Sequence, residues 1–358
     1  MEDIKSILIK MVENRASDLH ITARAPMHYR VDGNLVNVSD KVLKPKEAQE
    51  VVFSLMTEDQ KKVFEEEKEL EFSFSIEGVA RYRVTVFQQQ SCVGCAIRMV
   101  PLEVWTIEEC GLPQDIVRQF CNANQGLVLV TGPTGSGKST TLAAMVDEIN
   151  RTRDCHIVTI EDPIEFIHVN KKSIVDQREV FEDTHSFSNA LKHVLRQDPD
   201  VILIGELRDL DTISHAMTIA DTGHLVLGTL HTPDTIQTIN RIIDVFPPYQ
   251  QKQIRAQLSF VLIGMLAQQL LPRKDEPGQL LATEILVATP AIRSMIRDAK
   301  EHQLYSVLQT SQNVGMKTMN QALASLYLSG KISYERAISK TMDVEELTKL
   351  IEREGAVK

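Results

Sequence analysis

A glycine-rich segment carries the residues of this chain whose types and spacing best suit phosphate chemistry. It has the pattern Gly132-x-x-x-x-Gly137-Lys138-Ser139, in which glycines let successive backbone N–H groups close around a phosphate chain. The N-terminus of a following helix would add a partial positive charge. We expect Lys138 to reach the β- and γ-phosphates of a nucleoside triphosphate and Ser139 to bind Mg²⁺. The predicted nucleotide-binding residues are Gly132, Pro133, Thr134, Gly135, Ser136, Gly137, Lys138, Ser139 and Thr140.

The residues on either side of this pattern argue against a chance match. The apolar run at residues 127–131 precedes the loop and is typical of a buried strand, and helix-forming residues follow at 141–145. An ordinary glycine turn would need neither neighbour. Because a strand, a loop and a helix in this order are the context that a phosphate-binding loop requires, the sequence predicts binding of ATP together with Mg²⁺.

Chemically useful side chains follow three further apolar runs. Residues 157–160, 201–204 and 225–230 are continuous apolar segments, as expected for central parallel strands. The residues that follow them are Glu161 and Asp162, then Gly205 and Glu206, then His231 and Thr232. Ligands of open parallel sheets bind beyond the carboxyl ends of the strands. We therefore expect these groups to gather beside the phosphate loop.

Each of these groups has a candidate role in hydrolysis. Glu206 is the candidate general base or water-orienting group for attack on the γ-phosphate. Gly205 stands where such sites commonly carry an aspartate, so Glu161 or Asp162 is expected to supply that carboxylate through Mg²⁺-bound water. His231 is a candidate sensor of the γ-phosphate; the alternative is a strand-end histidine that caps backbone groups.

The phosphate loop itself contains no arginine that could stabilise charge on the γ-phosphate. Arg81 and Arg83 alternate with apolar residues, which places both on one face of a predicted strand. With Arg98 on a nearby strand, they are candidate arginine fingers if the N-terminal domain closes over the nucleotide in a hexameric ring. A solvated strand face is the alternative explanation, and Arg178 and Arg208 are rival candidates.

Two regions with different sequence patterns must position these residues. Residues 1–100 combine an amphipathic N-terminal helix with alternating strand-like segments, which predicts a small α+β domain. Residues 101–115, which contain two prolines and a glycine, are interpreted as a linker. Over residues 116–358 apolar strands alternate with helices, and helices dominate after residue 290. This pattern predicts an α/β phosphate-loop domain with C-terminal helices.

Composition narrows the classes of protein. A net charge of −10 disfavours a general attraction to nucleic acid. The N-terminus lacks the features of a signal peptide, and the longest apolar runs are too short to span a membrane, so we expect a cytoplasmic protein. Cys92 and Cys95 form a CxxC pair without the second pair that structural zinc usually needs, so buried thiols are the preferred interpretation.

Taken together, these segments resemble the type IV pilus retraction ATPases (the PilT family of the secretion-ATPase superfamily) over essentially the whole chain. The matching segments are Ser17-Asp-Leu-His20, Val79-Ala-Arg-Tyr-Arg83, the phosphate loop, Thr159-Ile-Glu-Asp-Pro-Ile-Glu-Phe166, Gln177-Arg-Glu-Val180, Gly205-Glu-Leu-Arg-Asp209, Thr222-Gly-His-Leu225 and Thr229-Leu-His-Thr232. The segment around Glu161 resembles the Asp box of this family, that around Glu206 its atypical Walker B motif, and that around His231 its His box.

The resemblance implies a homohexameric motor with a PAS-like N-terminal domain and a RecA-like ATPase domain. ATP would bind between the two domains and near a subunit interface. Hydrolysis would act through the pilus platform protein in the inner membrane and remove pilin from the filament base, which powers pilus retraction and twitching motility. The resemblance also implies a cytoplasmic protein held at the inner membrane face through the pilus machine, with no nucleic-acid partner and no transmembrane segment of its own.

A late helix favours retraction over extension. The segment Thr289-Pro-Ala-Ile-Arg-Ser294-Met-Ile-Arg-Asp298 resembles the Ala-Ile-Arg-Asn helix of retraction ATPases, with Ser294 at the usual asparagine. We expect Thr289 and the following proline to start this helix. Its predicted apolar face is Ile292, Met295, Ile296 and Ala299, and Arg293 and Arg297 align at i, i+4. A plain packing helix is the alternative.

Other functions remain open at this point. Pilus-assembly and type II secretion ATPases usually carry a longer N-terminal region and a tetracysteine motif, which this sequence lacks. Ser294 keeps an accessory retraction paralogue open. A nucleic-acid translocase is disfavoured by the acidic balance, and a scaffold without hydrolysis is disfavoured by the complete set of Lys138, Ser139, Glu161 and Glu206.

Overall fold

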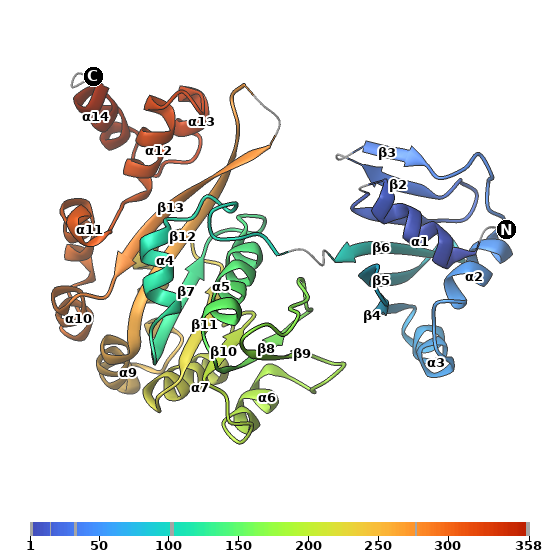
Figure 1. Cartoon of the computed structure of the whole chain (residues 1–358), viewed down its shortest axis with the longest axis horizontal. Coiled ribbons are helices and arrows are strands. Elements are labelled where there is room, and N and C mark those ends of the chain that lie inside the picture. The colour runs from blue at the N-terminus through green and yellow to red at the C-terminus, as the bar shows by residue number, and fades with distance from the viewer. Residues whose placement is uncertain (1–2, 15, 32–33, 101–103, 276–277, 356–358) are drawn as a thin grey trace. The chain divides into compact units, whose positions relative to one another are not determined.

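A computed structural model describes residues 3–14, 16–31, 34–100, 104–275 and 278–355 of the chain. The contacts within it separate two compact units (Figure 1). The small unit is Met1–Glu103 with Glu165–Ile167, and the large unit is Val104–Ile164 with His168–Lys358. Each unit has its own sheet and its own apolar core, so each is described by itself.

The described residues of the small unit form a six-stranded antiparallel sheet in the order β3-β2-β1-β6-β5-β4, with three helices. Its elements are α1 (Ile4–Glu13), β1 (Asp18–Ile21), β2 (His28–Val31), β3 (Asn34–Asn37), α2 (Pro45–Phe53), α3 (Glu58–Glu67), β4 (Glu69–Ile76), β5 (Ala80–Gln89) and β6 (Cys92–Val100). Tyr82 and Val84 of β5 are fully buried in the core with Leu8 of α1. Arg81 and Arg83 alternate with them and belong to the opposite face, as predicted.

The large unit contains a seven-stranded sheet in the order β13-β12-β7-β11-β10-β8-β9. The strands are β7 (Gly126–Thr131), β8 (His156–Glu161), β9 (Ile174–Glu179), β10 (Val201–Ile204), β11 (Leu225–Leu230), β12 (Leu262–Pro272) and β13 (Gln279–Val287). Only β13 among these runs antiparallel to its neighbour. The four predicted apolar strands are confirmed as β7, β8, β10 and β11.

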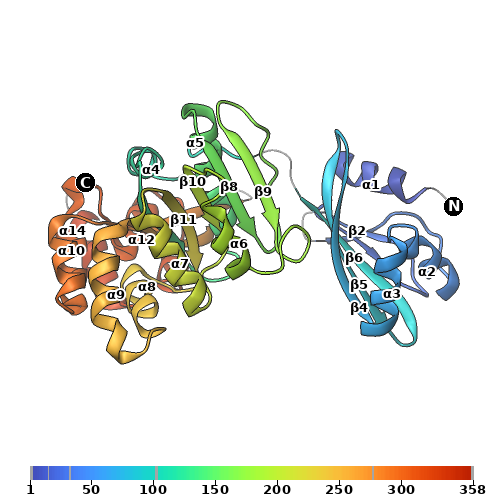
Figure 2. The same ribbon diagram turned by 90° about the horizontal axis from the view of Figure 1, so that it is seen from below.

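Helices cover both faces of this sheet (Figure 2). They are α4 (Gln114–Cys121), α5 (Lys138–Thr152), α6 (Phe187–Val194), α7 (Leu210–Asp221), α8 (Thr235–Asp244) and α9 (Pro248–Val261). Val128 and Val130 of β7 share a core with α4 and α5, whereas Leu127 and Leu129 share a core with α6 to α9. Because β7 is buried on both faces, its carboxyl end fixes where the phosphate loop leaves the sheet.

The chain after the sheet is helical, as predicted. Its α-helices are α10 (Pro290–Arg297), α11 (Leu304–Thr310), α12 (Met319–Leu328), α13 (Tyr334–Ile338) and α14 (Val344–Gly355). Thr289 caps α10, and Ile292 and Ile296 are fully buried. The assignment of Ala299 to this apolar face was wrong. Ala299 lies beyond the helix end, exposed, with φ of 57°, because its N–H and that of Lys300 bond back to Ile296 and Met295 and turn the chain out of the helix.

Two smaller observations complete the fold. Cys92 and Cys95 are buried, as predicted, and burial raises the pKa of Cys95 to about 12. Among the helices of the described residues, none has the length and apolar character needed to cross a membrane.

Candidate nucleotide-binding site

The phosphate loop connects β7 to α5 and depends on glycine at defined points. Gly132 has φ of 142°, and a Cβ there would lie 2.5 Å from the Gln268 carbonyl oxygen and 2.6 Å from Ser136 Oγ. Gly137 has φ of 87° and is the N-cap residue of α5. Both backbone conformations are ones that L side chains rarely adopt. The sequence pattern is therefore a requirement of this loop's shape.

Charge and hydrogen-bonding groups in the loop fit a phosphate chain. The buried Lys138 Nζ donates to the carbonyl oxygens of Gly132 at 2.9 Å and Pro133 at 3.1 Å. Ser136 Oγ is buried with no hydrogen-bond partner recorded among the described residues. An ammonium, an unpaired hydroxyl and the first N–H groups of α5 thus meet at one helix N-terminus, which is a favourable place for an anion.

The neighbouring strands end next to this loop. β11 lies beside β7, β10 beside β11, and β8 beside β10, all parallel. Their carboxyl ends deliver His231, Glu206 and Glu161, in that order. The structure therefore confirms that the predicted groups fall at adjacent strand ends on the phosphate-loop side of the sheet.

His231 lies between the phosphate loop and Glu206. Its Nδ1 is 3.5 Å from Thr134 Oγ1, and its Nε2 is 3.6 Å from Glu206 Oε2. Arg208 Nε lies 2.7 Å from the same Glu206 oxygen. Both contacts of the His231 ring are thus with side chains of the site. The rival arginine, Arg208, is paired with the candidate base Glu206.

Glu161 is held by two residues that sequence reasoning did not select for the site. Its Oε1 accepts hydrogen bonds from Thr159 Oγ1 at 2.6 Å and from Gln177 Nε2 at 3.2 Å. Asp162, the other candidate for Mg²⁺, is exposed. The i, i+2 spacing of Thr159 and Glu161 on one strand would have indicated a shared face. Gln177 is on the neighbouring strand β9, and no local spacing reveals that pairing.

The missing aspartate at Gly205 has a steric explanation. A Cβ on Gly205 would lie 3.3 Å from Glu161 Cα and 3.4 Å from the Ile160 carbonyl oxygen, both of them backbone atoms. The backbone here is fixed, because Gly205 N–H bonds to Ile160 O at 2.8 Å and its carbonyl accepts Thr229 Oγ1 at 2.5 Å. A side chain at this position would therefore require β8 and β10 to move apart by a few tenths of an ångström.

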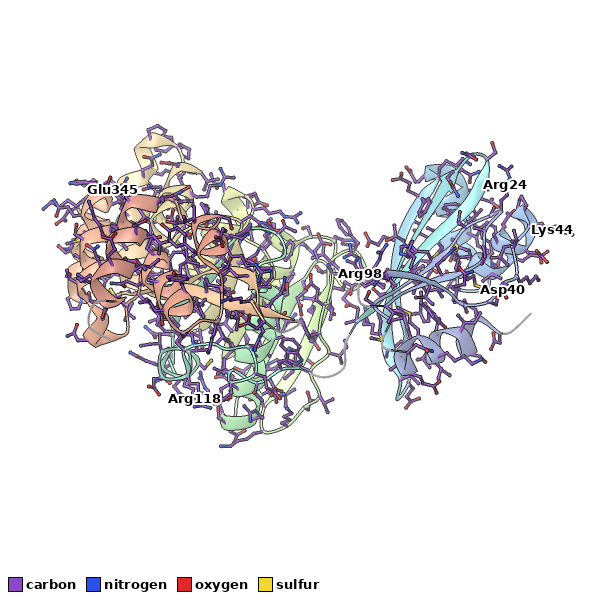
Figure 3. The ribbon with its side chains drawn as sticks, turned by 90° about the horizontal axis from the view of Figure 1, so that it is seen from above. Arg24, Asp40, Lys44, Arg98, Arg118 and Glu345 are labelled. Carbon is purple, nitrogen blue, oxygen red and sulfur yellow. The ribbon has the colours of Figure 1, made fainter. Side chains whose placement is uncertain are left out.

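The candidate arginines of the small unit lie on one face of its sheet. Arg83 and Arg98 are directly opposed in the register of β5 and β6 (Figure 3 labels Arg98). Arg98 Nε donates to Asp18 Oδ1 at 2.8 Å, and Arg83 forms an ion pair with Glu71. Burial acts to raise the pKa of Asp18, but hydrogen bonds from Ser17 and Arg98 outweigh it and lower the pKa.

The last rival arginine, Arg178, lies on β9 of the large unit. Its Nη2 donates to the Asp183 carbonyl at 3.0 Å. That carbonyl belongs to the turn after β9, so the recorded contact of Arg178 holds this turn.

A RecA-like α/β unit with a phosphate loop, and with carboxylates and a histidine at the adjacent strand ends, defines a P-loop ATPase. A family model described as "Type II/IV secretion system protein" matches residues 1–338. The chain is 47% identical over 338 residues to the Pseudomonas aeruginosa type IV pilus retraction ATPase PilT, covering 94% of this chain and 98% of that protein. It is 41% identical over 349 residues to the type IV pilus ATPase PilU of the same organism, covering 98% and 91%.

A solved structure agrees with these relatives. The crystal structure of the pilus retraction motor PilT with bound ADP superposes with a TM-score of 0.92 at 46% identity, covering 98% of this chain and 100% of that one. The chain belongs to the type II/IV secretion system protein family, within its group of type IV pilus retraction ATPases, and it is an ATPase.

Proposed function

We propose that this ATPase works as a homohexamer whose hydrolysis of Mg²⁺-bound ATP powers type IV pilus retraction. In this proposal it acts from the cytoplasmic face of the inner membrane, through the pilus platform protein. The similarity to pilus retraction ATPases supports the direction of the motor, and the observation that carries its nucleotide chemistry is the position of His231 between Thr134 of the phosphate loop and Glu206. That arrangement lets one site register the γ-phosphate and its loss, which a nucleotide-driven motor requires.

Binding and metal coordination fall to the phosphate loop and the end of β8. Lys138 would exchange its carbonyl partners for the β- and γ-phosphate oxygens, a charge-assisted contact of greater strength. The Ser139 hydroxyl and, through water, Glu161 or the exposed Asp162 would hold Mg²⁺. When bound, that ion stabilises negative charge on the phosphoryl oxygens. Thr159 and Gln177 orient Glu161 for this task.

The hydrolytic groups are those at the ends of β10 and β11. Glu206 would orient the attacking water and accept its proton, as general bases do. His231 would contact the γ-phosphate and hold the Glu206 carboxylate in place from the other side. Arg81 or Arg83 of the small unit, with Arg98 as a third candidate and Arg208 as the local rival, would stabilise charge on the transferred phosphoryl group.

Filament counting tests the biological direction of the motor. Deletion of the coding sequence should leave excess surface filaments, and wild-type protein should restore normal numbers while a Glu206→Gln variant should not. Loss of all filaments on deletion would instead identify an assembly or secretion ATPase and would overturn the proposal.

An accessory paralogue is the second candidate, because Ser294 replaces the asparagine usual in the late helix of retraction ATPases. Retraction of individual filaments in the deletion strain separates the two. Complete loss of retraction identifies the main motor, whereas retraction that continues with reduced force or frequency identifies the accessory role.

A further inference from the structure

Glu284 is a buried carboxylate that the hydrolytic site does not use. It lies on β13 with an exposed fraction of 4%. The hydrogen bonds recorded to it come from neutral donors: Oε1 accepts Thr235 N–H at 2.9 Å and Thr235 Oγ1 at 2.7 Å, and Oε2 accepts Met319 N–H at 3.3 Å. Burial is also the main cause that raises its pKa. A charge this deeply buried is costly, so its retention calls for a reason.

The two donors are the first residues of two different helices. Thr235 begins α8 and Met319 begins α12. The first N–H groups of a helix have no partner within the helix, and the positive ends of two helix dipoles meet at this carboxylate. Only a carboxylate offers two acceptor oxygens and no donor. A glutamine could serve one helix, but its NH₂ group would face the N–H of the other.

The segment from His231 to Thr235 links the Glu284 contacts to the hydrolytic site. Thr235 follows His231 by four positions, and the residue between them that caps α8 is Asp234, whose Oδ1 accepts Gln237 N–H at 2.7 Å. A cavity of about 280 Å³ borders the place where Glu284 meets the two helix N-termini. Its lining includes Pro233, Asp234, Glu284 and Met319. Residues at the N-termini of both α8 and α12 therefore border free volume on this side of Glu284.

We propose that Glu284 is a positioning residue that ties the His231 loop to the C-terminal helices by holding the N-termini of α8 and α12 together. The proposal rests on the proposed role of His231 in sensing the γ-phosphate. Movement of the His231 loop on nucleotide turnover is thereby passed to α12, and movement of α12 is passed back to His231.

Met319→Pro tests the tie by removing a single N–H group. Proline is well tolerated at the first position of a helix, and Thr318, with φ of −80° and ψ of 159°, already has the conformation preferred before proline. Met319→Ala is the matched control, because it loses the side chain and keeps the N–H. In the full-length protein we expect Met319→Pro to lower kcat on the order of tenfold, with KM for ATP and the kcat of Met319→Ala within about twofold of wild type.

A second background separates this inference from the role of His231. In His231→Ala protein, Met319→Pro should cause no further loss of kcat, because both changes act through one group. Equal kcat in Met319→Pro and Met319→Ala would overturn the role of Glu284 and leave that of His231 intact. An undiminished effect of Met319→Pro in the His231→Ala background would do the same. Wild-type kcat in His231→Ala itself overturns the role of His231 and the tie with it.

Thr235 provides the same comparison from the other helix, should Met319→Pro fail to fold. Thr235→Val removes the hydroxyl donor to Oε1 and keeps the shape and the N–H, and Thr235→Ser keeps the donor. A fall in kcat with Thr235→Val, absent with Thr235→Ser and absent in the His231→Ala background, supports the tie. Equal kcat for both substitutions overturns it.

Discussion

At the scale of single residues, the site depends on glycines at points of close backbone approach, severe at Gly132 and milder at Gly205. Gly132 is pressed against the Gln268 carbonyl and Ser136, and Gly205 against the end of β8. The first is a known requirement of phosphate loops and can be read from the sequence. The second is a departure from the usual pattern, and only the spacing between β8 and β10 explains it.

Gly132→Ala tests the steric requirement of the loop. The added Cβ would meet atoms at 2.5 and 2.6 Å in a backbone conformation of φ 142°, so the loop must shift. We expect the affinity for ATP to fall by at least about tenfold and the free energy of unfolding to fall by about 1–3 kcal/mol, measured by nucleotide titration and denaturant unfolding.

Gly330→Ala is the matched control for this experiment. Gly330 also has a positive φ, of 73°, but a Cβ there would find no atom within 4 Å. It should cost about 1 kcal/mol of stability and leave ATP binding unchanged. If both variants bound ATP like the wild type, the steric account of the loop would be wrong.

At the scale of elements, α10 shows how two arginines of one helix can differ. Arg293 Nε donates to Ala288 O at 2.9 Å and its Nη1 to Ser259 O at 2.7 Å, which holds the C-terminal end of α9. Burial lowers the pKa of Arg293. Arg297 is 48% exposed and contacts Ser294 and Asp298 within its own helix segment.

This difference predicts unequal effects of two substitutions. Arg293→Ala should lower the free energy of unfolding by about 1–3 kcal/mol, because it leaves carbonyl groups at the end of α9 without a donor. Arg297→Ala should change it by less than about 0.5 kcal/mol. Denaturant unfolding of both variants measures this, and equal effects would show that the contacts of Arg293 with α9 do not stabilise the fold.

His168, between β8 and β9, predicts an acid sensitivity of the large unit. Burial lowers the pKa of His168 from its ordinary value of 6.5 to about 4. The unfolded chain therefore binds the proton more tightly than the folded chain, so stability is full above pH 6.5 and falls as the pH drops toward 4. The contribution is about 1.4 kcal/mol per pH unit in that window.

His168→Gln removes this titration. Unfolding free energies measured between pH 7.5 and 5 should decline less steeply in the variant than in the wild type. Parallel declines in the two proteins would assign the acid sensitivity to other groups.

The elements were predictable from the sequence to the extent that local pattern determines them. Continuous apolar runs indicated the four central parallel strands, and alternation indicated the faces of β5. The end of α10 was missed, because Ala299 continues the apolar spacing while its backbone turns left-handed. The contact of Glu161 with Gln177 on β9 and the contacts of Glu284 with the starts of α8 and α12 join distant segments, and no local pattern encodes them.

At the scale of the whole molecule, we propose that arginines of the small unit serve a nucleotide site in which the local arginine Arg208 is paired with Glu206. Arg83 and Arg98 already have carboxylate partners, Glu71 and Asp18, on the same sheet. They would have to exchange these for a phosphate. Guanidinium groups bind phosphate well in such a role, and in the proposed hexamer this exchange would accompany ATP binding.

Mixing variants tests action across subunits. Arg81→Ala and Arg83→Ala should each impair hydrolysis more than ATP affinity, with a loss of up to about 10³-fold for the acting arginine. Mixed with Lys138→Ala subunits, which keep the arginines but cannot bind ATP, the inactive arginine variant should regain part of its activity. Wild-type rates in both single variants would remove these arginines from the mechanism, and no recovery in the mixture would place the acting arginine in the same subunit.

The central claim is that the large unit holds a hydrolytic site built from the phosphate loop, Glu206 and His231. Its most direct test is ATP hydrolysis and ATP binding measured on the same preparation of Glu206→Gln. We expect ATP affinity close to that of the wild type and a kcat reduced by about 10²–10⁴-fold. Turnover at the wild-type rate would contradict it, because the group between His231 and Arg208 would then have no part in the reaction.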